Sequence, residues 1–222
     1  MALRALAMTG PAFFADRTDA GRQLAERLGH FRGRDCVVLA LPRGGVPVAL
    51  PVAWALDAPL DLLFVRKIGA PHHPEYAIGA VVDGADPQVV LNDDLPAPLA
   101  APGGYVDSQV PLLLEEIRRR RKAYLGGRQP MPVQGRIVVV VDDGIATGAT
   151  MLAALRGLAR LDPAQVIVAV PVAADEALAR LRDAADRIVC LHMPRPFLAV
   201  GLHYADFDQV SDAEVVAALA GR

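Results

Sequence analysis

The stretch RIVVVVDDGIATGATM, residues 136–151, decides the fold class. After its first residue it is apolar at five consecutive positions, which is typical of a strand covered on both faces, as in a parallel sheet. Two carboxylates, Asp142 and Asp143, follow the run, and a helix-period segment covers 149–160. A buried strand, a short polar loop and a helix form the repeating unit of an open α/β sheet.

The same alternation continues on both sides of this stretch. Further strands are expected at 36–41, 60–66, 77–82, 165–170 and 187–192, and further helices at 16–31, 46–56, 105–124, 175–185 and 212–219. This order predicts a single α/β domain over 1–222, built on a doubly wound, mostly parallel sheet flanked by helices.

Three places depart from the regular alternation. Consecutive strands around Asp83-Gly84 predict a small hairpin. Pro51 lies deep in the helix expected at 46–56 and should kink or shorten it. Residues 92–128, where two Gly pairs bracket a helix, are expected to form either a mobile lid or a static insertion.

The composition bounds the classes of partner. Of the 222 residues, 53% are hydrophobic and 22% are charged, which excludes a disordered chain. The net charge of −2 provides no basic field, so neither nucleic acid nor an anionic membrane is expected as a partner. The basic run 118–122 wraps around its helix beside Glu115 and Glu116, which favours a solvated or subunit-facing helix and leaves a homo-oligomer open.

Cysteine usage and hydropathy indicate a cytoplasmic protein. Cys36 and Cys190 lie in apolar runs, where buried thiols are expected rather than a disulfide or a metal pair. A membrane-spanning helix needs about 20 apolar residues, and the longest uncharged candidate, 46–56, is shorter and contains two prolines. The stretch 1–17 is a poor signal peptide.

The loop after the strand at 136–141 has the chemistry to bind a sugar phosphate. Thr147-Gly148-Ala149-Thr150 opens the next helix, where free N–H groups and the helix dipole favour a phosphate. Asp142 and Asp143 would repel a bare phosphate, so they indicate a ligand such as a ribose monophosphate that presents hydroxyls or a divalent metal between them. An acidic helix cap is the alternative. Neither G-x-x-x-x-G-K-S/T nor G-x-G-x-x-G occurs, which disfavours nucleoside triphosphatases and dinucleotide dehydrogenases.

Two other segments that leave strands carry cationic side chains. LALPRGGVPVA, 39–49, passes through Arg43-Gly44-Gly45, and the Arg43 guanidinium suits a diphosphate. An ordinary turn with an exposed arginine is the alternative. VRKIGAPHHPEYAIGAV, 65–81, places Arg66 and Lys67 just past the next strand, either as anion ligands or as ordinary surface cations.

The motif VVVVDDGIATGAT, 138–150, resembles the phosphoribosyl-pyrophosphate signature of type I phosphoribosyltransferases, in which a hydrophobic strand is followed by two acids, Thr-Gly and a closing Thr or Ser. The resemblance implies that Asp142 and Asp143 bind the ribose hydroxyls. It also implies that the 5′-phosphate is bound by Ala146, Thr147, Gly148, Ala149 and Thr150. The family's pyrophosphate loop, often with a strained peptide, would be Arg43, Gly44 and Gly45, and the leaving pyrophosphate would be neutralised by Arg66 and Lys67.

The whole chain is similar to stand-alone bacterial phosphoribosyltransferases whose acceptor is unassigned. The segment 193–222 resembles their C-terminal hood. There, Phe197, Tyr204 and Phe207 would either stack on an acceptor base or be plain core. Ala146 stands where enzymes acting on 6-oxopurines typically carry an Asp, which counts against hypoxanthine or guanine. The candidate general bases are Glu75, His72 and His73; two histidines without a third ligand are weak grounds for a metal site.

The implied activity is transfer of the phosphoribosyl group of phosphoribosyl pyrophosphate to a nitrogenous acceptor, such as a nucleobase, with release of pyrophosphate. This implies a role in nucleotide metabolism and nucleoside salvage. The implied catalytic residues are Asp142, Asp143, Arg43 and Lys67, and Mg²⁺ is the implied cofactor, bound mainly through the substrate near the two acids. A non-catalytic regulator that senses phosphoribosyl pyrophosphate or a nucleotide is one alternative. A sugar-phosphate phosphatase or isomerase with a coincidental loop is the other.

Overall fold

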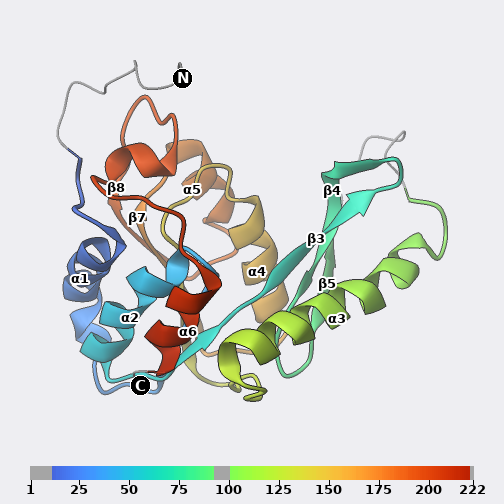
Figure 1. Ribbon diagram of the computed structural model, residues 1–222, viewed down its shortest axis with the longest axis horizontal. Helices are drawn as coiled ribbons and strands as arrows, with labels where there is room; N and C mark the ends of the chain where they lie inside the picture. Colours follow the sequence, from blue (N-terminus) through green and yellow to red (C-terminus); the bar gives the residue numbers. More distant parts are fainter. Residues whose placement is uncertain (1–11, 93–100, 221–222) are drawn as a thin grey trace.

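A five-stranded sheet, parallel throughout, forms the centre of the protein (Figure 1). The structure is a computed structural model that describes residues 12–92 and 101–220. In spatial order the strands are β2 (Leu60–Leu62), β1 (Cys36–Ala40), β6 (Ile137–Val141), β7 (Gln165–Val172) and β8 (Arg187–His192). The predicted doubly wound α/β class is confirmed.

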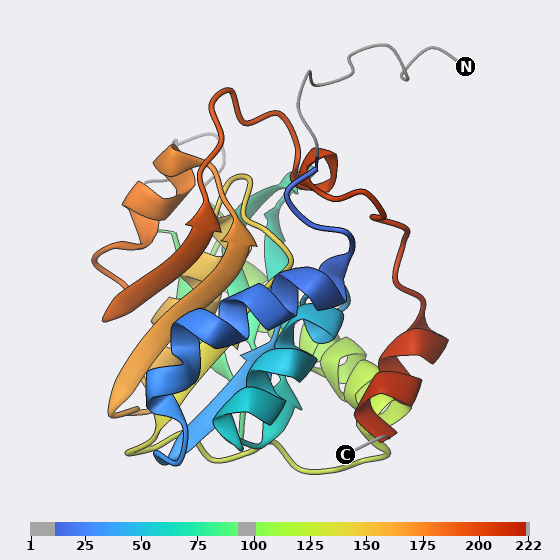
Figure 2. The same cartoon turned by 90° about the vertical axis from the view of Figure 1, so that its left-hand side faces the viewer.

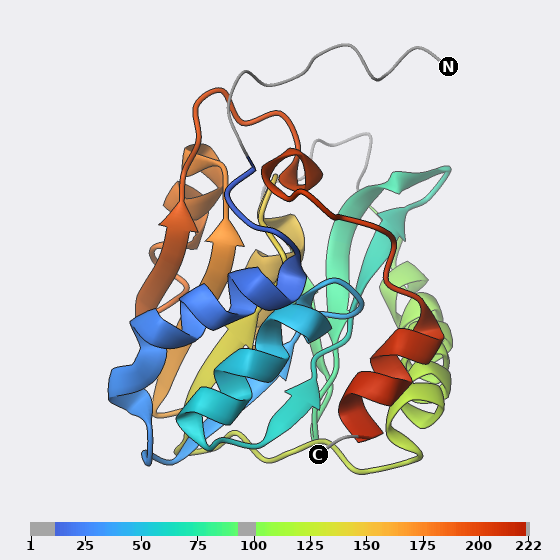
Figure 3. The same cartoon turned by 60° about the vertical axis from the view of Figure 1, so that its left-hand side comes forward.

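Helices cover both faces of this sheet. On one face lie α1 (Arg17–Leu28), with a short 3-10 turn η1 (Gly29–Phe31) after it, and α2 (Gly45–Leu56); Figure 2 shows α1 and α2 in front of the strands. On the other face lie α4 (Ala149–Ala159) and α5 (Asp175–Leu181), behind the sheet in Figure 3. The helix expected at 175–185 therefore ends earlier than predicted.

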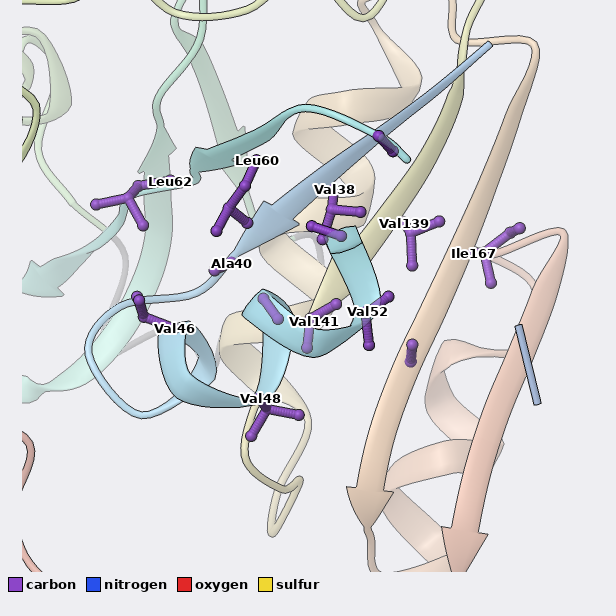
Figure 4. Close-up of a cluster of buried hydrophobic side chains, with 14 of the residues drawn as sticks. Val38, Ala40, Val46, Val48, Val52, Leu60, Leu62, Val139, Val141 and Ile167 are labelled. Atoms are coloured by element: carbon purple, nitrogen blue, oxygen red, sulfur yellow. The ribbon is translucent and has the colours of Figure 1, made fainter. Parts of the chain in front are cut away.

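Alternate residues of the central strands enter two different cores, which explains why their sequences are apolar at every position. Val38 of β1 and Val139 of β6 pack with Val52 of α2, as Figure 4 shows. Their neighbours Val37 and Val138 lie in the core beneath α4 and α5. Each fully buried side chain of this kind contributes about 1.5–3 kcal/mol, so neither face of these strands tolerates polar residues.

A second, antiparallel sheet interrupts the alternation. It consists of β3 (Val65–Ala70), β4 (His73–Val82) and β5 (Gln88–Leu91), with α4 against one face and α3 (Tyr105–Leu125) against the other. Figure 1 shows α3 running along this small sheet. The predicted hairpin around Asp83-Gly84 is confirmed by the antiparallel pairing of β4 with β5.

The prediction of one strand over 60–66 is wrong. The chain leaves the central sheet after Leu62 and enters the second sheet at Val65, so two strands share this apolar run. Hydrophobicity alone marks both pieces as buried and cannot show that they belong to different sheets.

Pro51 was expected to kink or shorten the helix at 46–56, and the shortening is wrong, because α2 extends from Gly45 to Leu56 with Pro51 inside it. The kink stays a prediction. Pro51 is buried against α1. A Cβ on Gly21 of α1 would lie 2.4 Å from the Val48 carbonyl oxygen and 3.1 Å from Pro51 Cγ. Close helix packing at a glycine therefore stabilises a helix that contains a proline.

The basic run 118–122 is not uniformly solvated, which corrects the expectation for this helix. Arg121 is only 7% exposed and donates hydrogen bonds to Asp61 at 2.6 Å and to Asp83 at 2.7 Å. Asp61 lies on β2 and Asp83 follows β4. This buried ionic cluster therefore joins α3 to both sheets.

The segment after β8 runs as an extended chain with a 3-10 turn, η3 (Val200–His203), and ends in α6 (Asp212–Ala220). α6 packs on α2 and α3, and Figure 3 shows the extended chain crossing toward it. Cys36 is a buried free thiol, whereas the free thiol of Cys190 is only half-buried. Among the described helices, none is long and apolar enough to cross a membrane.

Candidate active site

The candidate site lies where the strand order reverses. The chain passes from β1 to β2 on one side, whereas β6 pairs with β1 on the other. The loops after β1 and β6 therefore leave the same edge of the sheet as neighbours, and the Leu41 N–H donates to the Val141 carbonyl at 2.9 Å. Ligands of open α/β sheets bind at such a reversal, beyond the carboxyl ends of the strands.

The Arg-Gly-Gly loop packs directly on the acidic pair. A Cβ on Gly44 would lie 2.0 Å from Asp143 Oδ2, and a Cβ on Gly45 would lie 2.7 Å from the Val141 carbonyl oxygen and 3.1 Å from Asp142 Cα. A larger residue at Gly44 would displace the Asp143 carboxylate, and one at Gly45 would displace the backbone of the other loop. The preceding peptide, between Pro42 and Arg43, is cis. Two motifs that lie far apart in the sequence thus form one surface.

The two acids have different surroundings. Asp142 Oδ1 accepts a hydrogen bond from the Asp143 N–H at 2.9 Å, and burial together with the Asp143 charge raises the pKa of Asp142 well above its usual range. Asp143 Oδ2 accepts a hydrogen bond from Arg17 Nε at 2.8 Å. Burial raises the pKa of Asp143, and the Arg17 guanidinium opposes that rise. Both acids are half-buried, and Arg17 pairs with one of them, which a helix cap that faces only solvent would not show.

The loop that leads into α4 presents open backbone donors. Gly148 precedes the helix with a φ of +78°, in the left-handed region that favours glycine. Within the described residues, no acceptor receives a hydrogen bond from the backbone N–H groups of 146–150. Thr147 and Thr150 are exposed. The loop is therefore free to bind an anion at the positive end of the helix dipole.

The structure does not bring Arg66 and Lys67 together. They are consecutive residues of β3 and face opposite sides of the small sheet. Arg66 lies against α3, with Nε 3.1 Å from Glu116 Oε1, and burial lowers its pKa. Lys67 is exposed and lines a cavity of about 90 Å³ with Thr150 at the start of α4. Only Lys67 lies on the side of the open backbone donors.

Arg43 has a partner that the sequence did not reveal. Its Nη1 lies 3.3 Å from Asp212 Oδ1 at the start of α6, and the Tyr124 hydroxyl donates to the same oxygen at 2.6 Å. Arg17 is a second functional candidate that sequence reasoning missed, because nothing near it in the chain marks its contact with Asp143. The first and last described helices, α1 and α6, thus each contact one of the candidate residues.

The tail aromatics mostly serve packing. Tyr204 is buried beside Phe14, and its hydroxyl donates to the Asp143 carbonyl at 2.6 Å. Phe207 packs on Tyr204, and Phe197 lies against His203. Stacking of these rings on an acceptor stays a prediction.

The other candidate residues lie at the turn between β3 and β4. His73 and Glu75 belong to the exposed first part of β4, and His72 precedes them with a φ of +62°. Among the described residues, no group of three or more His, Cys, Asp or Glu side chains is arranged to hold a metal ion. The structure describes 105–125 as a packed helix, while 93–100 lie outside the described residues, so movement of 92–128 stays a prediction.

Comparison with known proteins gives consistent matches. The sequence pattern of the family described as "Phosphoribosyl transferase domain" matches residues 15–205. Two Mycobacterium tuberculosis proteins, from strains CDC 1551 and H37Rv, are provisionally named phosphoribosyl transferases and are each 49% identical over 206 residues. The match covers 93% of this chain and 46% of each relative, so the chain spans about half the length of the curated relatives it matches.

Solved structures show the same fold. The crystal structure of TT1426 from Thermus thermophilus is 44% identical, with a TM-score of 0.80 over 94% of this chain and 98% of that one. A hypothetical protein from Neisseria gonorrhoeae with bound ppGpp is 17% identical, with a TM-score of 0.51 over 93% of both chains, a likeness of fold alone.

Proposed function

Because the chain belongs to the phosphoribosyl transferase family, we propose that it transfers the phosphoribosyl group of phosphoribosyl pyrophosphate to a nitrogenous acceptor, such as a nucleobase, with release of pyrophosphate. The main support is the packing of the Arg-Gly-Gly loop on the acidic pair, with Gly44 against the Asp143 carboxylate. This contact joins a cationic loop to two carboxylates, and the open backbone donors of 146–150 follow the same acids in the chain. A sugar that carries phosphates at both ends would use all three groups.

Each part of the substrate has a partner of matching chemistry. The N–H groups and hydroxyls of 146–150 would bind the 5′-phosphate. Asp142 and Asp143 would accept hydrogen bonds from the ribose hydroxyls and stabilise positive charge on the ring. Arg43, with the backbone of its loop, would bind the pyrophosphate.

In the reaction, the bond from ribose C1 to the pyrophosphate oxygen breaks and a bond from C1 to the acceptor nitrogen forms. The bonding electrons leave with pyrophosphate, and the acceptor nitrogen gives its proton to solvent or to a base. Fixed charges around the reacting carbon would supply most of the rate enhancement. Lys67 would add positive charge from the α4 side of the small sheet.

The donor set fits Mg²⁺ that is held mainly by substrate. Mg²⁺ in phosphate-processing sites is usually bound by one or two carboxylates together with substrate phosphates and water, and Asp142 and Asp143 provide that number. The ion would offset negative charge on the leaving pyrophosphate. The choice of acceptor stays open, with Ala146 giving no carboxylate for a 6-oxopurine.

Incubation with phosphoribosyl pyrophosphate, Mg²⁺ and a panel of nucleobases, read by product mass and pyrophosphate release, tests the proposal. Calorimetry with phosphoribosyl pyrophosphate is expected to show that the Asp142→Asn/Asp143→Asn double variant no longer binds this ligand. The matched control, Asp107→Asn/Asp183→Asn, removes two exposed acids and should bind normally. Unchanged affinity in the first variant would refute the site, and binding without turnover for any acceptor would favour the regulator.

A further inference from the structure

Arg17, the first residue of α1, links the acidic pair to the C-terminal tail. Its Nε donates to Asp143 Oδ2 at 2.8 Å, and its Nη1 donates to the Asp208 carbonyl at 2.8 Å. Its guanidinium carbon lies 3.8 Å from the centre of the Phe207 ring. With 11% of the side chain exposed, Arg17 is nearly enclosed by these contacts.

Three groups contact Asp143 and fix its position. Arg17 holds Oδ2, the backbone of Gly44 lies against the same oxygen, and the Tyr204 hydroxyl donates to the Asp143 carbonyl. Among the described residues, none donates a hydrogen bond to Oδ1. Oδ2 thus accepts a hydrogen bond from Arg17, and Oδ1 can accept one from a ligand.

We propose that Arg17 is a positioning residue for phosphoribosyl transfer: it fixes the orientation of the Asp143 carboxylate, with Oδ1 directed to a ribose hydroxyl, and holds 207–208 beside it. This inference rests on the proposed function. An arginine suits the role because its planar fork makes two directed hydrogen bonds while its face stacks on an aromatic ring, which a lysine cannot do.

The contacts around Asp143 give the proposal a measurable signature. Arg17 contacts the carboxylate from α1 and Tyr204 contacts the Asp143 carbonyl from the tail, whereas the loop with Gly44 offers only backbone there. Because Arg17 would act on a ligand through Asp143, its loss should weaken a ligand that carries the ribose hydroxyls and leave the binding of pyrophosphate alone near the wild-type value.

The test compares Arg17→Gln and Arg17→Lys with Arg22→Gln, which removes an exposed arginine of the same helix. Calorimetry measures the Kd for phosphoribosyl pyrophosphate and for pyrophosphate alone, and thermal unfolding shows whether each variant is folded. In Arg17→Gln we expect the Kd for phosphoribosyl pyrophosphate to rise about 10- to 100-fold, the usual effect of removing a residue that orients a ligand-binding group, while the Kd for pyrophosphate stays near the wild-type value. In an Asp143→Asn background the same change should have no further effect on the Kd.

Arg17→Lys keeps the charge but loses the planar fork and the stack on Phe207, so it should recover only part of the affinity for phosphoribosyl pyrophosphate. Arg22→Gln should match wild type in both measurements. An equal loss of affinity for both ligands in folded Arg17→Gln, or the same loss again in an Asp143→Asn background, would overturn the proposal. A wild-type protein that fails to bind phosphoribosyl pyrophosphate would refute the proposed function, a result distinct from binding that Arg17→Gln leaves unchanged.

Discussion

Gly44→Ala should disable the site without disturbing the backbone. Gly44 has φ −60° and ψ −34°, a helical conformation that alanine adopts freely. The added Cβ, however, would lie 2.0 Å from Asp143 Oδ2 and 2.5 Å from Cγ. Because non-bonded carbon atoms make contact at about 3.5–4.0 Å, the carboxylate has to retreat by roughly 1–1.5 Å.

The displacement of the carboxylate determines how much ligand affinity should be lost. The same oxygen accepts the Arg17 hydrogen bond at 2.8 Å, so the ion pair is broken as the carboxylate moves. Misplacing a reacting or binding group by about 1 Å costs about 100-fold, which corresponds to about 2.7 kcal/mol at 1.36 kcal/mol for each factor of ten. We therefore expect the Kd for phosphoribosyl pyrophosphate to rise about 100-fold.

Calorimetry measures this Kd without knowledge of the acceptor, and thermal unfolding shows whether the variant remains folded. Gly29→Ala is the matched control, since Gly29 has φ −54° and nothing lies within 4 Å of an added Cβ. A folded Gly44→Ala protein that binds within threefold of wild type would show that the position of the Asp143 carboxylate does not determine affinity.

Three further predictions concern charge. Burial and the Asp143 charge raise the pKa of Asp142, so the folded protein favours its protonated form and loses stability as pH rises through that pKa. Asp142→Asn should therefore melt a few degrees higher than wild type at pH 8, at about 2–4 °C for each kcal/mol, with the difference vanishing in acid when melting is followed against pH. Arg121→Met removes the buried cation that Asp61 and Asp83 share, leaving Asp61 only Arg128 at 3.9 Å among the described residues, and should cost about 3–5 kcal/mol in urea unfolding. Neutralising both aspartates as well should recover part of this loss, and no recovery would contradict the ionic account. Lys67→Ala should weaken binding of phosphoribosyl pyrophosphate more than Arg66→Ala by calorimetry, because only Lys67 lies on the α4 side, and the reverse order would refute this placement.

The sequence was most informative where signals are local. The all-apolar run before Asp142 and Asp143 requires a strand covered on both faces, and the two cores on either side of β6 account for it. The opposite placement of Arg66 and Lys67 follows from the two-residue period of a strand. The prediction did not reveal it because the strand was expected to end at residue 66, whereas β3 continues to Ala70.

Other features depend on contacts that no local pattern encodes. Arg17 meets Asp143 across 126 positions of the chain and Asp208 across 191. Among adjacent arginines in 118–122, only the orientation of α3 decides that Arg121 points inward. The division of 60–66 between two sheets likewise depends on tertiary packing, since both halves are equally apolar.

The close contact at Gly21 fixes the position of α1, which carries Arg17, relative to α2, which follows the Arg-Gly-Gly loop. α1 starts at Arg17, α2 starts at Gly45 beside the cationic loop, and the missing side chain of Gly21 sets the spacing between these helices. A side chain added at Gly21 would separate the two helices and move the Arg17 guanidinium away from Asp143. Gly21 itself lies between the helices and belongs to neither loop. Laboratory evolution for altered sugar affinity should therefore return changes in this helix contact as readily as in the loops themselves.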